Sequence, residues 1–256
     1  MVEDMSIELK DILDYNVTLG ALKNILKTLL VEGNVDLDFL REKVALNKFD
    51  LVSHSLSFLK RLQLVKLSGN KVISNISHKE LNILRAIILN RLTMSNDPYV
   101  HYLIPFLDRF LSTKEYYEQK DVWHILAVTR FKENVKSPRE ELSFKLRILI
   151  RHLKELGLAI TYKNFVIPVV DPLLVLEIIK HMGILEGSMY ELLNIIKDKY
   201  LPCCDPYGKP YSPLVKAFEY LERLSFLKLS SKSDAGLEYS VGGKNCNFWE
   251  VLSLEY

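Results

Sequence analysis

Residues 58–67 read FLKRLQLVKL, and the pattern returns twice, as HLKELGLAIT at residues 152–161 and as YLERLSFLKL at residues 220–229. In the first half of each stretch, and just before it, apolar residues recur every three or four positions, which is the spacing of an amphipathic helix. After one small or polar residue, the apolar side chains follow in short runs that favour a β-strand. The sequence therefore predicts three helices that each run into a strand, and it indicates an internal repeat.

A turn and a second strand are predicted after each of these strands. The paired strands are expected at residues 64–67 and 71–74, at 158–162 and 165–169, and at 226–229 and 237–241. Short turns separate the first two pairs, and a longer polar loop at residues 230–236 separates the third pair. Each of the three helices is therefore expected to lead into a β-hairpin.

The segment before the first hairpin contains the remaining parts of a known arrangement. A helix is predicted over residues 19–31 and ends at Gly33, a second begins after Asp36 as its N-cap, and a third covers residues 48–62. Three helices followed by a hairpin resemble the winged-helix family of helix-turn-helix domains. The resemblance implies a mainly α fold with small β-hairpins, the wings, in tandem winged-helix domains joined by helices.

The same reading divides the whole chain. The expected parts are winged-helix domain 1 at residues 1–76, connecting helices at 77–112, winged-helix-like domain 2 at 113–170, a connecting helix at 171–187 and winged-helix-like domain 3 at 188–256. Connecting helices are predicted at residues 78–94 after a capping box of Ser77 and Glu80, at 98–111, and at 172–181. Domain 2 is expected to hold one or two helices within 113–134 and a long helix from Ser137 and Pro138 to Leu156, and domain 3 helices at 188–200 and 214–224.

Composition narrows the class of protein. With 256 residues, of which 48% are apolar and 26% charged, the chain is typical of a globular protein with more than one domain. No run of about 18 uncharged apolar residues is present, so no membrane span is predicted. The opening residues Met1, Val2, Glu3 and Asp4 do not resemble a secretory signal, and a cytoplasmic location is the expectation.

No catalytic or metal-binding pattern is visible. Phosphate-loop, dinucleotide and serine-hydrolase motifs are absent, and the pair Gly242 and Gly243 is interpreted as a turn. The six histidines are scattered, and Cys203, Cys204 and Cys246 lack the spacing of a zinc site or a disulfide framework. We therefore expect no catalytic residues, no metal and no cofactor, and an enzyme is the least favoured interpretation.

Charge is uneven along the chain although the net charge is only +2. Residues 41–71 contain seven basic and two acidic side chains, and residues 121–170 contain nine basic and five acidic ones. Such islands are typical either of patches that face DNA or of ordinary solvated helix faces.

The three repeated helices differ in the face that they are expected to turn outward. A helix that enters the major groove needs one buried face and one small, polar or basic face. Positions spaced by 100° per residue, together with lysines on the first two hairpins, give these candidate DNA-binding residues: Ser53, His54, Ser57, Lys60, Arg61, Lys66, Lys71, Ser143, Arg147, Arg151, Lys154 and Lys163. In the third helix Lys216, Glu219 and Arg223 share a face beside Glu222, and this mixed charge suits a protein partner better.

Two functions from different classes follow. The resemblance implies a DNA-binding protein whose partner is double-stranded DNA, acting as a transcription regulator or as a replication initiator of the plasmid or viral kind. The alternative is a protein-interaction scaffold, because winged helices also serve as docking modules in kleisin-associated condensin subunits, general transcription factors, polymerase subunits and ESCRT-II. A protein partner is then expected at domain 3 or at the helices of residues 77–111, and a homodimer stays open.

Overall fold

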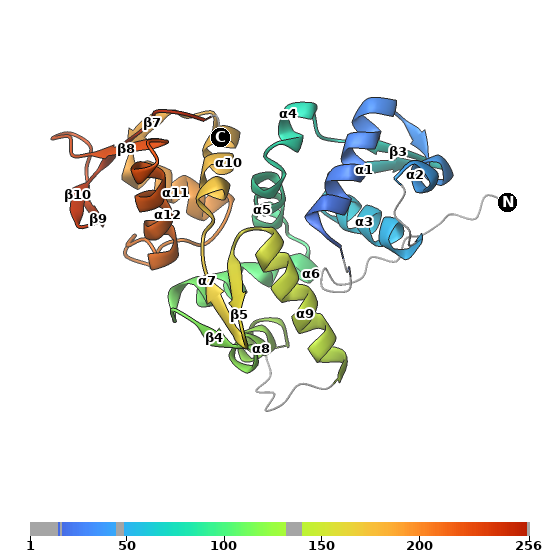
Figure 1. Ribbon diagram of the computed structural model, residues 1–256, viewed down its shortest axis with the longest axis horizontal. Coiled ribbons are helices and arrows are strands. Elements are labelled where there is room, and N and C mark those ends of the chain that lie inside the picture. Colours follow the sequence, from blue (N-terminus) through green and yellow to red (C-terminus); the bar gives the residue numbers. More distant parts are fainter. Residues whose placement is uncertain (1–14, 16, 45–48, 132–139, 255–256) are drawn as a thin grey trace.

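The computed structural model describes residues 15, 17–44, 49–131 and 140–254, and Figure 1 shows their arrangement. Helices make up the larger part of these residues, and the strands form small antiparallel sheets of two or three strands. The chain is thus a mainly helical protein with small sheets. Among the described residues, no helix is both long enough and apolar enough to cross a lipid bilayer.

One order of elements, namely helix, short strand, two helices and two strands, occurs three times. In residues 17–76, the first unit, the elements are α1 (Leu19–Glu32), β1 (Val35–Asp36), α2 (Leu37–Lys43), α3 (Phe49–Arg61), β2 (Val65–Ser68) and β3 (Lys71–Ser74). In residues 103–170, the second unit, they are α7 (Leu103–Ser112), β4 (Tyr117–Glu118), α8 (Gln119–Leu126) with the π-helical turn η2 (Ala127–Phe131), α9 (Glu140–Glu155), β5 (Ala159–Tyr162) and β6 (Phe165–Pro168). In residues 172–254, the third unit, they are α10 (Pro172–Met182), β7 (Glu186–Ser188), α11 (Met189–Lys199), α12 (Ser212–Arg223), β8 (Leu227–Ser230) and β11 (Phe248–Val251), with β9 (Tyr239–Val241) and β10 (Lys244–Cys246) inserted before β11.

The three sheets also share one strand order. In each unit the last strand lies in the middle, between the short first strand and the strand that follows the long helix, giving the orders β1-β3-β2, β4-β6-β5 and β7-β11-β8. All pairs are antiparallel, with Val35 opposite Val72 in the first unit and Tyr117 opposite Val166 in the second. The short first strands of two or three residues were not predicted from the sequence.

The transition from helix to strand has the same construction in all three units. The second residue after the helix has a positive φ, which is 57° at Gln63, 76° at Gly157 and 60° at Ser225. The backbone N–H of the following residue then reaches back five positions, as from Leu64 to the carbonyl of Leu59 at 2.8 Å. This is the Schellman end of a helix, and it explains the small or polar residue in each repeat of the sequence pattern.

The left-handed residue in the first unit is not glycine, which leads to a prediction. An L-residue in this conformation costs about 1–2 kcal/mol of strain, which glycine does not have. Glycine also loses more conformational entropy on folding, and this loss offsets part of the gain. We expect Gln63→Gly to raise the free energy of unfolding by about 0.5–1 kcal/mol in urea denaturation. Gln63→Ala keeps the Cβ atom and serves as the control without a gain. A loss of stability in Gln63→Gly would contradict the assignment of the strain to this residue.

Two connecting segments are interrupted where single helices were predicted. The capping box of Ser77 and Glu80 is confirmed, but the helix breaks after Leu81 into α4 (His78–Leu81) and α5 (Leu84–Met94). The next segment likewise forms α6 (Pro98–His101) and then α7. The predicted helix start at Ser137 and Pro138 lies outside the described residues.

The prediction for the third hairpin is wrong in its pairing. Residues 239–241 form β9, but they pair with β10, while β8 pairs with β11. The reason lies in Gly242 and Gly243, whose φ angles of 60° and 79° close a tight turn directly after β9. The chain therefore folds back on itself before it returns to the sheet with Phe248.

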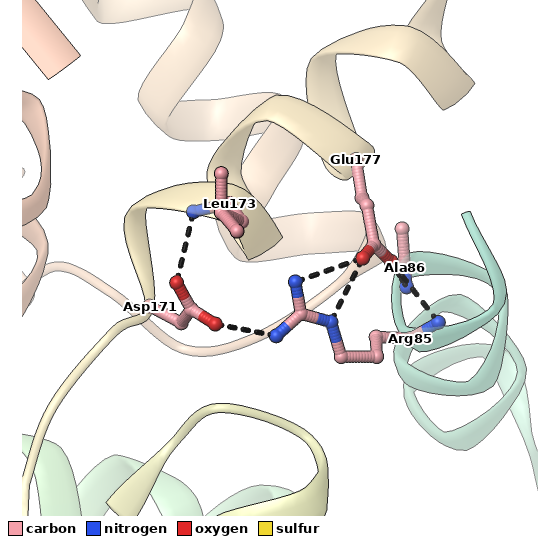
Figure 2. Close-up of polar contacts among 5 residues, drawn as sticks. All are labelled: Arg85, Ala86, Asp171, Leu173 and Glu177. Carbon is pink, nitrogen blue, oxygen red and sulfur yellow. Dashed lines mark hydrogen bonds and ion pairs between the residues drawn. The ribbon is translucent and has the colours of Figure 1, made fainter. Parts of the chain in front are cut away.

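The units share one continuous hydrophobic core, with α5 between them (Figure 1). Four consecutive residues of α5, from Ala86 to Leu89, are buried, so this turn of the helix is covered on all sides. Arg85 stands at the start of α5, and its Nε donates to Glu177 of α10 at 2.8 Å while its Nη1 donates to Asp171 at 2.5 Å (Figure 2). The Glu177 carboxylate in turn accepts the backbone N–H groups of Arg85 and Ala86, so it caps α5 from the third unit.

Candidate nucleic-acid interface

Helix α9 turns its predicted basic face to solvent. Leu146, Leu149 and Leu153, which recur every three or four positions, are buried. The candidate residues of this helix are all exposed, namely Ser143, Arg147, Arg151 and Lys154, and so is Phe144. The helix is held by its leucines, and its polar side is left on the surface.

The basic side chains of α9 form one stripe. Arg147, Arg151 and Lys154 are spaced by four and three residues, so they lie above one another along the helix. The guanidinium of Arg147 lies 6.0 Å from the ring centre of Phe144, which is 46% exposed. Glu155 is the one acidic side chain of α9 that the structure describes, and it points elsewhere, because it accepts the backbone N–H of Leu19 at 3.3 Å.

The hairpin of β5 and β6 follows α9 in the chain and contacts it through β5. Its exposed tip carries Lys163, whose ammonium lies 5.3 Å from the ring centre of the exposed Tyr162. Ile160 is also exposed, so apolar and aromatic groups accompany the lysine. Ile160 and Tyr162 were not predicted from the sequence. Their spacing of two residues along the strand places them on one face, and this spacing is a signal that could have identified them.

The prediction that Arg61 and Ser57 of α3 face outward is wrong. Arg61 is 3% exposed at its side chain, and its Nε donates to Asp97 at 2.8 Å. Ser57 is buried, and the other candidates on α3 are only half exposed, namely Ser53, His54 and Lys60.

This burial has a tertiary cause that the period of α3 does not reveal. The ring of Phe58 packs against His152 of α9 at 5.6 Å between ring centres, and Tyr15 packs edge-on against both Phe58 and His54. The outer side of α3 is therefore covered by other parts of the chain and is not open to a major groove. Lys66 and Lys71 remain exposed on the hairpin of the first unit.

In the third unit, the inserted hairpin of β9 and β10 lies against α12. The backbone N–H of Gly242 donates to Glu219 at 2.8 Å, and the ammonium of Lys244 pairs with Glu222. Lys216 and Arg223 are exposed as predicted. The two carboxylates of α12 thus bind the inserted hairpin.

The three cysteines are buried, and the hydrogen bond between Cys203 and Cys204 lowers the pKa of Cys204. All three thiols are free, and the sulfur atoms of Cys203 and Cys204 are 3.6 Å apart. The hydrogen bond with Cys204, together with burial, raises the pKa of Cys203 well above its usual value, so this thiol is protonated at neutral pH. Within the described ranges, no three His, Cys, Asp or Glu side chains gather as a metal site would require.

Comparison with known proteins adds no relative: no protein-family model matches the chain, and no curated protein or solved structure matches it either.

Proposed function

We propose that the chain is a DNA-binding protein built from three tandem winged helices. The support for the fold is the threefold recurrence of one element order and one strand order, which agrees with the order that the resemblance implies. In this assignment, α7 and α10 are the first helices of the second and third winged helices. The second and third domains then begin at about residues 103 and 172, earlier than expected from the sequence.

The second unit is the part that we assign to DNA, with α9 as the recognition helix. One observation carries this assignment, namely the exposed stripe of Arg147, Arg151 and Lys154 along α9. An arginine can bind guanine or phosphate through two parallel hydrogen bonds, and an α-helix fits the width of the major groove. Lys163 and Tyr162 at the hairpin tip lie where a wing meets the sugar–phosphate backbone.

The other two units have supporting roles in this proposal. Ser53, His54, Ser57, Lys60 and Arg61 are withdrawn as base contacts, because α3 is covered. Lys66 and Lys71 are kept as phosphate contacts for a duplex that extends past the second unit. The function is then regulation of transcription or initiation of replication, and it needs no chemistry by the protein.

The proposal predicts a selective loss of affinity. We expect the double variant Arg147→Ala, Arg151→Ala to bind duplex DNA more weakly by about 1–3 kcal/mol for each lost contact. The slope of log affinity against log salt should fall by about one for each lost phosphate contact. Fluorescence anisotropy with a labelled random duplex across a salt series measures both quantities.

The matched control is Lys216→Ala, Arg223→Ala, which removes two exposed cations from α12 and keeps the net charge equal to that of the test variant. It should retain the affinity and the salt slope of the unchanged protein. If both double variants bind DNA equally weakly, affinity depends only on the net charge, and α9 is not the recognition helix.

A protein-interaction scaffold is the second candidate. It is favoured because two of the three repeated helices are covered by other parts of the chain. Helix α3 packs against α9, and the inserted hairpin of β9 and β10 lies against α12. If this function is correct, the unchanged protein will not bind the duplex even at low salt.

A further inference from the structure

The third unit exposes one edge of its sheet. Strand β7 pairs with β11 on one side, and no strand among the described residues pairs with its other side. Glu186 and the two residues before it, Ile184 and Leu185, are exposed. Unpaired backbone N–H and C=O groups on such an edge are a template for another strand.

An apolar groove of about 440 Å³ lies beside this edge. Its apolar lining comes from Met182, Ile184, Leu192, Ile195 and Trp249. Gly187 contributes no side chain to the groove, and a Cβ atom at this position would come within 3.5 Å of the indole nitrogen of Trp249. This is an ordinary contact distance, so a methyl group would fit here, and the strand borders the groove with backbone alone.

The opposite face of the same sheet carries an incomplete row of charges. Lys228 of β8, Glu250 of β11 and Glu186 of β7 lie side by side in the strand register. The ammonium of Lys228 is 3.8 Å from Glu250, whereas Glu186 has a like charge as its neighbour. Like charges directly opposite each other destabilise a sheet, so a cation on the free side of Glu186 would offset the repulsion.

We propose that β7 binds an extended segment of a protein partner in which apolar and basic residues alternate. Neighbouring side chains of a strand point to opposite faces. A segment paired with β7 would therefore place an apolar side chain in the groove beside Gly187 and a lysine or arginine next to Glu186. Its backbone would pair with the free edge of β7, and the side chains would select the partner. Glu186 and Glu191 both line the groove beside its apolar residues, and Oε2 of Glu191 would lie 3.7 Å from a Cβ atom at Gly187, so a basic side chain of the segment has two carboxylates within the site.

Residues 1–14 do not have the composition of this occupant. Residues 1–14 contain five acidic side chains and one lysine, so their charge has the same sign as that of Glu186 and Glu191. The site is also separate from the proposed DNA-binding face on α9, because it belongs to another unit. A partner protein with a basic and apolar strand therefore matches the site in both charge and shape.

Synthetic peptides test the proposal on the full chain. The probe is a fluorescein-labelled peptide with the core Val-Lys-Val-Lys-Val, and its control has the same residues in the block order Val-Val-Val-Lys-Lys. We expect fluorescence polarisation to show saturable binding of the alternating peptide and at least about tenfold weaker binding of the block peptide, because only alternation matches the two faces. Amide hydrogen exchange in β7 should slow when the alternating peptide is bound.

A charge exchange distinguishes this site from general attraction. Glu186→Lys should lower the affinity for the alternating peptide by about tenfold. It should raise the affinity for a peptide in which glutamate replaces both lysines. Glu115→Lys changes an exposed carboxylate of the second unit by the same amount and should alter neither affinity. Equal binding of the alternating and block peptides, or an unchanged affinity in Glu186→Lys, would overturn the proposal. DNA binding by Glu186→Lys, measured in parallel, reports separately on α9 and confirms that the variant is folded.

Discussion

Glu177→Ala is expected to lower the free energy of unfolding by about 3–5 kcal/mol, because it removes one of the two carboxylates that balance the buried guanidinium of Arg85. Glu177 is 4% exposed, and its carboxylate accepts hydrogen bonds from the guanidinium and the backbone N–H of Arg85 and from the backbone N–H of Ala86. Asp171 alone then remains to balance the guanidinium. The change also removes the cap of α5, which lies at the centre of the molecule.

Urea denaturation at equilibrium measures this loss. Glu186→Ala removes an exposed carboxylate from the same unit and should change stability by less than about 0.5 kcal/mol. The double variant Arg85→Met, Glu177→Leu replaces the ion pair by apolar groups and should recover much of the loss. A cost below about 1 kcal/mol for Glu177→Ala would show that the network of Figure 2 does not hold the units together.

Gly157→Ala is expected to cost about 3 kcal/mol, and it acts on the same junction from the second unit. Gly157 has φ +76°, and a Cβ atom there would lie 2.7 Å from the Cβ of Asp171 and 3.0 Å from Nη1 of Arg85. The backbone would therefore be strained, and the ion pair between Arg85 and Asp171 would have to move.

Gly69→Ala separates the two contributions. Gly69 has φ +61°, but nothing lies within 4 Å of a Cβ atom built there. This control should cost only the backbone strain, about 1 kcal/mol, when both variants are compared by urea denaturation. If the two variants cost the same, the close approach of Gly157 to Asp171 has no energetic weight.

Features that depend on neighbouring residues were predictable from the sequence. The three helix-to-strand transitions follow from the spacing of leucines and from Gln63, Gly157 and Ser225, which are all within one helical turn of the boundary. The exposed face of α9 was predicted for the same reason, since its leucines alone decide which side is buried.

Features that depend on distant residues were not predictable. The partner of β8 is selected by the turn at Gly242 and Gly243, and the short strands β1, β4 and β7 exist only through the strands that they pair with. Arg61 looked like a surface cation because Asp97, its partner, is 36 residues away in the sequence.

The position of Glu177 in the sequence indicates that it has a partner. It lies between Leu176 and Ile178 in an apolar run, and a charged side chain that is buried in such a run must be paired. The sequence shows the need for a partner, but only the packing of α5 on α10 identifies it as Arg85.

The hydrogen bond from α1 to Glu155 has a consequence for the order of events during synthesis on the ribosome. Thr18 caps α1 locally, but the N–H of Leu19 at the start of α1 and the N–H groups at the start of α5 donate to Glu155 and Glu177, which are translated long after the helices themselves. A nascent chain that ends before these residues would expose the outer side of α3 and the apolar surface of α5, which are buried in the finished protein. Folding of the first unit and of α5 is therefore completed only when the later segments are made. Until α10 emerges, a chaperone would be needed to keep these apolar surfaces from aggregating.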